Sequence, residues 1–168
     1  MNVRTVPVTT ADRPILERLL QLHLHDFSEF QPTELTPEGA FDYPWLDDYF
    51  TSANREAYLI TADGLLAGFA LIRCDVPGDD GAWNVSEFFV ARGHRRRGTA
   101  STAARQLFQR HPGVWTLAFL EHNVPAARLW PTLAEAVSEG PVERVRKIPP
   151  EVPAAKSRLR FRVVEQAG

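Results

Sequence analysis

The amino-acid sequence predicts an α/β fold with a mixed sheet of six to seven strands and about four helices. Apolar residues recur at helical spacing in three segments, and apolar runs of strand length lie between and around them. One tight-turn signal, Ala62-Asp63-Gly64, joins two of these runs and predicts a β-hairpin. The expected order is β-α-α-β-β-β-α-β-α-β-β. The 168 residues suit one domain, residues 1–168.

The first half of the chain is expected to begin with a short strand near residues 3–6. A helix follows, capped by Thr9 or Thr10, with Pro14 in its first turn. Its apolar face is expected to consist of Ile15, Leu16, Leu19, Leu20 and Leu22. Residues 27–50 are aromatic, acidic and interrupted by three prolines, which favours a loop with one short helix near residues 44–52. Strands are expected at residues 56–60, 65–74 and 83–90.

The second half of the chain shows two clear helix patterns. The first has its apolar stripe at Ala100, Ala103, Ala104, Leu107 and Phe108. It ends at His111-Pro112-Gly113 and is followed by a strand at residues 114–120. The second helix is capped by Asn123 and is expected to bury Ala126, Leu129, Trp130 and Leu133. In residues 158–164, apolar residues alternate with arginines, which predicts a strand with one buried face.

Composition and charge exclude several classes of protein. The single cysteine, Cys74, rules out an internal disulfide and a cysteine-cluster metal site. The sequence shows no signal-peptide pattern and no membrane-length apolar run, so we expect a cytoplasmic protein. The net charge of −2 conceals an acidic region at residues 26–56 and a basic region at residues 144–162. Such regions are commonly solvated faces, but the acidic one is a plausible seat for a cationic ligand.

Residues 88–108, FFVARGHRRRGTASTAARQLF, place a cationic loop between a strand and a helix. Four arginines and a histidine fall between Arg92 and Arg97, and Gly98 then precedes the helix. The first amides of a helix have no partner inside it, and the helix dipole favours negative charge there. The segment therefore predicts a phosphate site. Neither a P-loop nor a G-x-G-x-x-G motif is present, which argues against a P-loop NTPase and a dinucleotide fold.

This loop resembles the signature of the GNAT N-acetyltransferases, [RQ]-x-x-G-x-[GA], which is matched by 95-RRRGTA-100. Val90 stands five residues earlier, where the family's fourth strand ends. A second family element, N-x-x-A-x-x-x-Y, is matched by 123-NVPAARLW-130 except that Trp130 replaces the tyrosine. The resemblance implies a mostly antiparallel GNAT-like sheet with splayed central parallel strands.

The resemblance also implies that acetyl-CoA is the co-substrate and that an amine attacks it directly in a ternary complex. The pyrophosphate would lie on the amides of Arg95, Arg96, Arg97, Gly98, Thr99 and Ala100. The pantetheine arm would pair with backbone near Phe89 and Val90 and touch Asn123, which can also be a plain helix cap. The Val90 N–H would meet the oxyanion of the tetrahedral intermediate.

An alkyl ammonium is only about 0.04% neutral at pH 7, so the acceptor must lose a proton before it attacks. Glu87 is the first candidate for the base, with Glu121 and His122 as second choices; a solvent-facing or arginine-paired Glu87 is an equal alternative. Trp130 cannot protonate the departing thiolate, and its expected role is packing. The thiolate leaves unaided or is protonated by another group, such as Tyr43, Tyr49 or Tyr58.

The acceptor is expected to be a small-molecule or peptide amine, and a cationic one, bound by Asp47 and Asp48 of the acidic region. A catalytically silent acyl-CoA-binding or sensing domain is the main alternative, for which Trp130 is the best argument. A nucleic-acid binder lacks support because the overall charge is not basic. We expect no membrane partner and no resident metal. The sequence leaves open whether the protein forms a homodimer.

Overall fold

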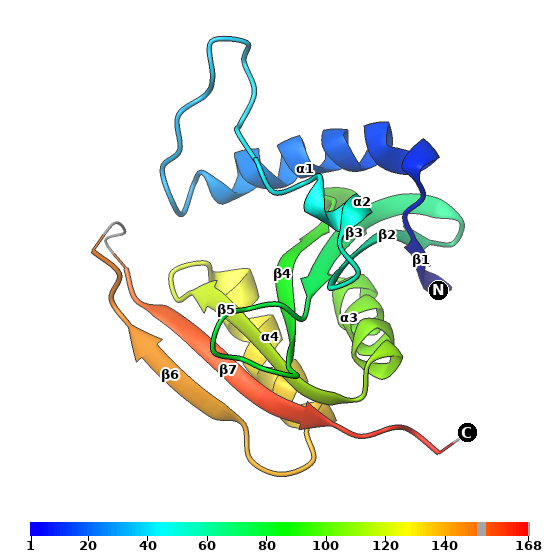
Figure 1. The fold of residues 1–168 in the computed structure, drawn as a ribbon, viewed down its shortest axis with the longest axis vertical. Helices are drawn as coiled ribbons and strands as arrows, with labels where there is room; N and C mark the ends of the chain where they lie inside the picture. Colours follow the sequence, from blue (N-terminus) through cyan, green and yellow to red (C-terminus); the bar gives the residue numbers. More distant parts are fainter. Residues whose placement is uncertain (151–153, 168) are drawn as a thin grey trace.

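The structure, a computed structural model, describes residues 1–150 and 154–167 (Figure 1). A seven-stranded sheet crosses the molecule in the order β1-β2-β3-β4-β5-β7-β6. Neighbouring strands are antiparallel except for β4 and β5, which are parallel. This confirms the α/β fold with a mostly antiparallel sheet. The strands are β1 (Val3–Pro7), β2 (Arg55–Ala62), β3 (Leu65–Arg73), β4 (Trp83–Val90), β5 (Gly113–Leu120), β6 (Glu143–Lys147) and β7 (Lys156–Val163).

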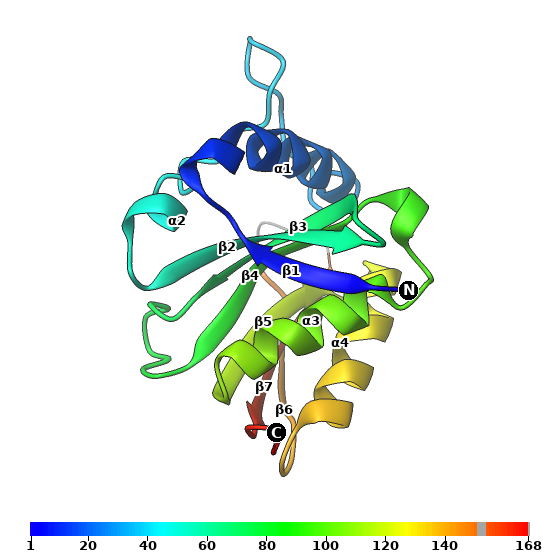
Figure 2. The ribbon, with the colours of Figure 1, turned by 90° about the vertical axis from the view of Figure 1, so that its right-hand side faces the viewer.

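Helices cover both faces of the sheet, α1 and α2 on one face and α3 and α4 on the other (Figure 2). The helices are α1 (Arg13–Phe27), α2 (Asp48–Thr51), α3 (Thr99–Arg110) and α4 (Val124–Val137), with short 3-10 turns η1 (Thr10–Asp12) and η2 (Arg92–His94). The expected cap of α1 at Thr9 or Thr10 is wrong by one short turn: Thr9 is the N-cap of η1, where its backbone N–H donates to Asp12 Oδ2 at 2.9 Å, and Asp12 is the N-cap of α1. One expected core residue is wrong: Leu22 is 55% exposed, because it lies off the stripe of Leu16, Leu19 and Leu20.

Three apolar clusters are formed by the described residues, and the two largest lie on opposite sides of the sheet. The core under α1 and α2 contains Phe69, Leu71 and Phe89. The core under α3 and α4 is larger and contains Trp115 and Trp130. Between α1 and α2, residues 28–47 form a long loop that projects beyond the sheet (Figure 1).

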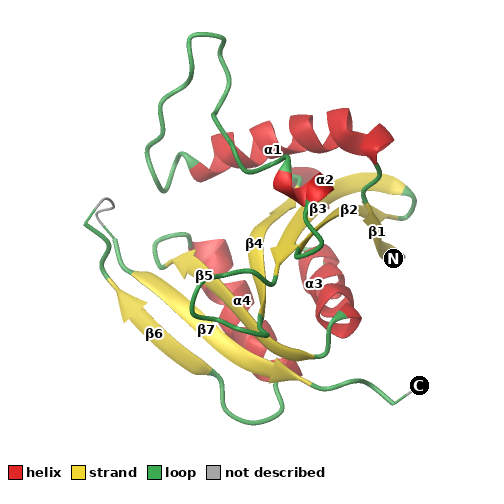
Figure 3. Cartoon of the chain, viewed as in Figure 1, coloured by secondary structure: helices red, strands yellow, loops and turns green. Residues whose placement is uncertain are grey.

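The carboxyl-terminal strands form the far edge of the sheet, with β6 outermost (Figure 3). The expected alternation in β7 is confirmed, since Leu159, Phe161 and Val163 are buried. The sequence predicted two strands at the carboxyl-terminal end of the chain, but it gave the position of only one of them. All five residues of β6, ERVRK, are exposed, so no alternation of buried and exposed positions marks that strand.

Candidate active site

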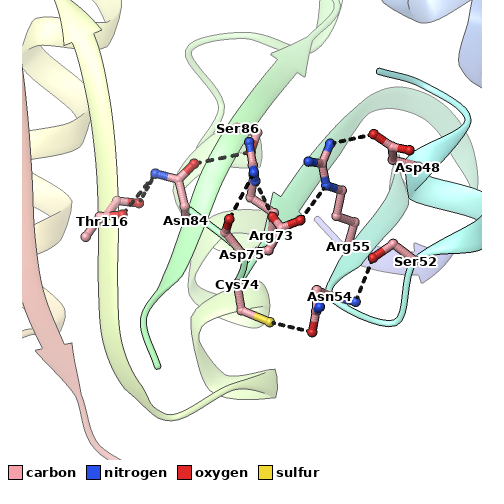
Figure 4. Close-up of polar contacts among 10 residues, drawn as sticks. All are labelled: Asp48, Ser52, Asn54, Arg55, Arg73, Cys74, Asp75, Asn84, Ser86 and Thr116. Atoms are coloured by element: carbon pink, nitrogen blue, oxygen red, sulfur yellow. Dashed lines mark hydrogen bonds and ion pairs between the residues drawn. The ribbon is translucent and has the colours of Figure 1, made fainter. Parts of the chain in front are cut away.

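The site is built where β4 and β5 separate. The two strands pair over three residues, from Trp83 opposite Trp115 to Val85 opposite Leu117. Asn84 Nδ2 binds across this pairing, donating to Thr116 Oγ1 at 2.9 Å and to the Thr116 carbonyl at 3.2 Å (Figure 4). Beyond that point the strands lean apart (Figure 3), while β4 continues along β3 and β5 along β7.

A cavity of about 880 Å³ lies at the mouth of this gap. It is bounded by the end of β4, the start of α3, the start of α4 and the last turns of α1. The side chains that line it include His23, Phe89, Arg96, Asn123 and Trp130. A second hollow, of about 990 Å³, lies between α3 and α4 and shares Arg96, Ser101 and Leu129 with it. The two hollows therefore adjoin one another.

The backbone of Val90 faces the gap. The N–H of Ala91 donates to the Ala67 carbonyl of β3 at 2.7 Å. In an antiparallel pair, successive residues point their N–H and C=O groups to alternate sides, so the groups of Val90 point away from β3. They therefore point toward the gap, whereas the backbone of Phe89 points back to β3. The Val90 carbonyl accepts a hydrogen bond from Arg95 Nε at 2.6 Å.

The loop between β4 and α3 has the geometry of an anion site. Arg96 and Gly98 both adopt positive φ, 60° and 79°, in the left-handed region. Alternation of this kind turns successive backbone N–H groups toward one side, which forms a concave nest for an anion. Gly98 is the N-cap of α3, so the first amides of that helix open onto the same place. Thr99 is buried, and Arg96 and Arg97 are exposed.

Arg95 is held by the protein on two sides. Besides Val90, it binds Asp26 at the end of α1, with 2.7 Å between Arg95 Nη2 and Asp26 Oδ2. Arg92 binds the other oxygen of Asp26 at 2.8 Å. Burial of Asp26 opposes its charge, but the hydrogen bonds from Arg95 and Arg92 outweigh burial and hold the pKa of Asp26 below its ordinary value. Asp26 thus links α1 to the loop of residues 91–98 between β4 and α3, which is called the anion loop below.

Asn123 and Trp130 stand on the opposite wall. Asn123 caps α4, as the sequence predicts, by accepting a hydrogen bond from the Ala126 N–H at 3.4 Å. Its side-chain NH₂ group is not used by that bond. Trp130 is 7% exposed and packs edge-to-face on Phe88, with 5.1 Å between ring centroids. Packing is therefore what the structure shows for this side chain.

Glu87 points to the α1 side of the sheet because β4 carries a bulge. The register of β3 and β4 shifts between Leu71 and Ile72, which leaves Ser86 as the extra residue. Val85 therefore packs under α3 and α4, whereas Phe89, four residues later, packs under α1. Without the bulge, Glu87 would face the same core as Val85.

Glu87 meets a residue that sequence reasoning missed. Its Oε2 lies 2.7 Å from Nε2 of His23 on α1, and both side chains are largely buried. His23 also packs edge-on against Phe69 and Phe89. It lies four residues after Leu19 and three after Leu20, on the buried stripe of α1, and this spacing could have identified it.

Tyr43 and Tyr49 pack in the core under α1 and α2, near enough to Glu87 for its charge to act on both hydroxyls. Burial, followed by the charge of Glu87, raises the pKa of Tyr43. Burial also raises the pKa of Tyr49. Tyr58 lies elsewhere, on β2, where its hydroxyl donates to Glu56. Burial and then Glu56 raise the pKa of Tyr58, so all three phenols are poorer acids than a free tyrosine.

The second-choice bases are occupied by other contacts. Glu121 accepts hydrogen bonds from Ser157 Oγ at 2.7 Å and from Arg146 Nε at 2.9 Å. These hydrogen bonds lower the pKa of Glu121, and the bond from Ser157 has the largest effect. His122 Nε2 lies 2.9 Å from the Phe30 carbonyl, so the loop of residues 28–47 contacts the loop after β5.

Asp47 and Asp48 are paired with arginines. Asp47 binds Arg13 at the start of α1. Asp48 lies 3.2 Å from Arg55, which also holds Asp75 at 3.0 Å (Figure 4). Within the described residues, neither aspartate is among the side chains that line the cavity.

Two further findings concern residues 1–150 and 154–167 as a whole. No three His, Cys, Asp or Glu side chains there are grouped so that they could hold a metal ion. Within the same residues, no helix combines the length and the apolar character needed to cross a bilayer.

Comparison with known proteins gives a family. The sequence model of the Acetyltransferase (GNAT) family matches residues 16–133, more than half of the chain. A search of the curated proteins finds no match. Among solved structures, an acetyltransferase from Thermus thermophilus is similar, with a TM-score of 0.72, 16% identity and coverage of 97% of this chain and 98% of the other.

Two further structures show the same fold with a bound molecule. One is assigned as a streptothricin acetyltransferase from Bacillus anthracis and contains acetyl-coenzyme A (TM-score 0.59, 13% identity, 96% and 99% coverage). The other is NAA60 from Arabidopsis thaliana in complex with a bisubstrate analogue (TM-score 0.62, 18% identity, 96% and 98% coverage). With the family match to residues 16–133, the chain belongs to the GNAT acetyltransferase family and is an acetyl-CoA-dependent N-acetyltransferase.

Proposed function

We propose that this enzyme transfers acetyl from acetyl-CoA to the primary amine of a cationic acceptor, by direct attack within a ternary complex. One observation carries the proposal. The cavity at the parting of β4 and β5 joins the anion loop at one end to His23 and Glu29 at the other. A thioester and an amine can thus meet in one continuous space.

Acetyl-CoA fits this space in one direction. The pyrophosphate lies on the amides between Arg95 and Ala100, where the nest and the start of α3 favour an anion. The pantetheine arm runs beside β4, and the unused NH₂ group of Asn123 can donate to it. The thioester oxygen then lies at the Val90 N–H, which is fixed before reaction begins and stabilises the oxyanion.

The adenosine end follows the groove between α3 and α4. Three arginines line that hollow, Arg96, Arg105 and Arg128. Cations on both helices suit the 3′-phosphate of the nucleotide. Val124 and Pro125, which also line the hollow, offer an apolar surface to the base.

The acceptor enters from the side of residues 28–47. Glu29 lines the cavity, and the same loop carries the exposed carboxylates Glu34, Glu38 and Asp42. Asp47 and Asp48 are already paired with Arg13 and Arg55. We therefore place the attraction for a cation at Glu29, Glu34 and Glu38 rather than at the two aspartates.

A matched pair of variants tests the acceptor charge. In Glu29→Gln/Glu34→Gln/Glu38→Gln, the KM for a diamine should rise roughly three- to tenfold at low salt, and the KM for acetyl-CoA should not change. The effect should shrink with added salt because salt screens exposed charges. The double variant Asp47→Asn/Asp48→Asn is the control and should leave both constants unchanged. If neutral or anionic amines are the best acceptors in a panel that monitors thiol release, the acceptor is not cationic.

A further inference from the structure

His23 and Glu87 form a pair in which one member faces the cavity. Their side chains are 2.7 Å apart, from Nε2 to Oε2, at the end of β4 beside Phe89. In the part of the chain that the structure describes, His23 is among the cavity-lining residues and Glu87 is not. The imidazole therefore stands between the carboxylate and the place where the acceptor amine must arrive.

The contact fixes which nitrogen of His23 carries the proton. An ionised carboxylate can only accept a hydrogen bond, so Nε2 must be the donor. The neutral ring then has its lone pair on Nδ1. Among residues 1–150 and 154–167, no hydrogen-bond partner occupies Nδ1. The ring thus presents a free proton acceptor, and the carboxylate behind it stabilises the imidazolium that forms on protonation.

We propose that Nδ1 of His23 takes the proton from the acceptor ammonium and that Glu87 is the positioning residue that orients His23. The proposal rests on the proposed function, since it concerns the proton transfer within that reaction. It also moves the role of base from Glu87, which the sequence indicated, to a residue on α1.

The steps balance without a separate acid. One proton passes from the ammonium to Nδ1, and the nitrogen lone pair then forms the C–N bond while the carbonyl electrons move to oxygen at the Val90 N–H. The intermediate collapses, the C–S bond breaks and its electron pair leaves on sulfur. The second proton, on the nitrogen of the intermediate, passes to the thiolate directly or through water. His23 returns its proton to solvent, so the products are the amide, CoA thiol and one proton.

This sequence of steps accounts for Trp130 in place of the family's tyrosine. The indole N–H is not an acid near neutral pH. Burial raises the pKa of both Tyr43 and Tyr49, so neither is a ready proton donor. The nitrogen of the intermediate supplies the proton that the thiolate needs.

The groups that face the pair from the surrounding elements set the electrostatics. The charge of Glu87 acts on Tyr43 from the loop and on Tyr49 of α2, and Tyr49 is also affected by Arg55 on β2 and Arg73 on β3. On the other side, Arg95 lies over the Phe89 ring and is bound to Asp26 of α1. Arg55 and Arg73 share Asp75, and Arg95 is bound to Asp26. These cations are largely balanced, which leaves Glu87 as the charge that His23 meets directly.

The test compares His23→Gln, Glu87→Gln and the control His25→Gln. Glutamine at position 23 can still donate to Glu87 but cannot accept the proton. We expect His23→Gln to lower kcat by roughly 10²–10⁴ and to remove the acidic limb of the kcat–pH profile. Glu87→Gln should lower kcat less, by about 10- to 100-fold, and move the limb to lower pH because the imidazolium loses its negative neighbour. His25, on the exposed side of α1, should be replaceable without effect.

Calorimetry with acetyl-CoA separates the outcomes. All three variants should bind acetyl-CoA as the wild type does. If Glu87→Gln loses the limb and His23→Gln keeps it, Glu87 is the base and the proposal is overturned, although the enzyme's function stands. If the wild type binds no acetyl-CoA or turns over no amine, the proposed function fails instead.

The wild-type profile is a second test that needs no variant to fold. A free imidazole titrates at about pH 6.5 and a glutamate side chain at about 4.3. The proposal expects the acidic limb of the kcat–pH profile to lie nearer the imidazole value, and a limb at the glutamate value contradicts it.

Discussion

A Cβ atom at Gly68 would lie 1.9 Å from the carbonyl oxygen of Phe89. Gly68 therefore lets β3 lie against the end of β4 at a distance that no other residue permits. The position of Val90, and with it the N–H that faces the gap, depends on this close approach.

Gly68→Ala should accordingly displace the end of β4. We expect a loss of about 1–3 kcal/mol in the free energy of unfolding, as for overpacked cores, together with weaker acetyl-CoA binding. Gly93→Ala is the matched control, because a Cβ there meets nothing within 4 Å. Urea denaturation and calorimetry measure the two effects. A Gly68→Ala protein as stable as wild type would show that β3 can move away without consequence.

Gly98→Glu should abolish acetyl-CoA binding. Its side chain would place a carboxylate where the pyrophosphate lies, at the positive end of α3. Because Gly98 has a φ of 79°, any side chain there also strains the backbone. Gly64→Glu controls for the strain, since Gly64 has a φ of 80° in the β2–β3 turn and open space around it. Both variants should lose similar stability in thermal melts, and Gly98→Glu alone should lose affinity; unchanged affinity would contradict the anion-loop assignment.

Asp26 makes the stability of the protein depend on pH. Its folded pKa is below the ordinary value of about 3.9, so its contribution is present above that value and is lost as pH falls through the folded pKa. Asp26→Asn should be less stable than wild type at pH 7, and this difference should shrink below about pH 4. Urea midpoints at several pH values measure it, with Asp80→Asn, at an exposed position, as the control. A difference that does not vary with pH would mean that the Asp26 charge is not involved.

Trp130→Phe should separate packing from catalysis. Phenylalanine keeps an aromatic ring against Phe88 but has no N–H, so the turnover of Trp130→Phe should stay within about threefold of wild type. Trp130→Ala removes the packed ring and should lower the free energy of unfolding by about 3–5 kcal/mol. Steady-state assays and urea denaturation measure both variants. A fall in kcat above tenfold for Trp130→Phe, with acetyl-CoA affinity intact, would give the indole a part in the transfer.

The order of elements and the anion loop could be predicted because they depend on local sequence. Helical spacing, the Asp63-Gly64 turn and Gly98 before a helix each act over a few residues. The second-last strand, β6, could not be located, since its five exposed residues are placed by pairing with β7. No short-range sequence pattern predicts a strand of this kind.

The arrangement around Glu87 depends on longer-range contacts. The bulge at Ser86 decides which face Glu87 occupies, and it is visible only in the register with β3. His23 is 64 positions away in sequence from its partner. The ion pairs of Asp47 and Asp48 with Arg13 and Arg55 likewise join separate elements, so the sequence alone could not show that these two carboxylates already have partners.

A crystal structure of the protein with acetyl-CoA tests the central claim most directly. We expect pyrophosphate oxygens within hydrogen-bonding distance of the amides between Arg96 and Ala100, and the thioester oxygen at the Val90 N–H. The pantetheine arm should lie between β4 and β5. Acetyl-CoA bound elsewhere on the molecule, with no contact to Val90 or to the loop before α3, would contradict the account.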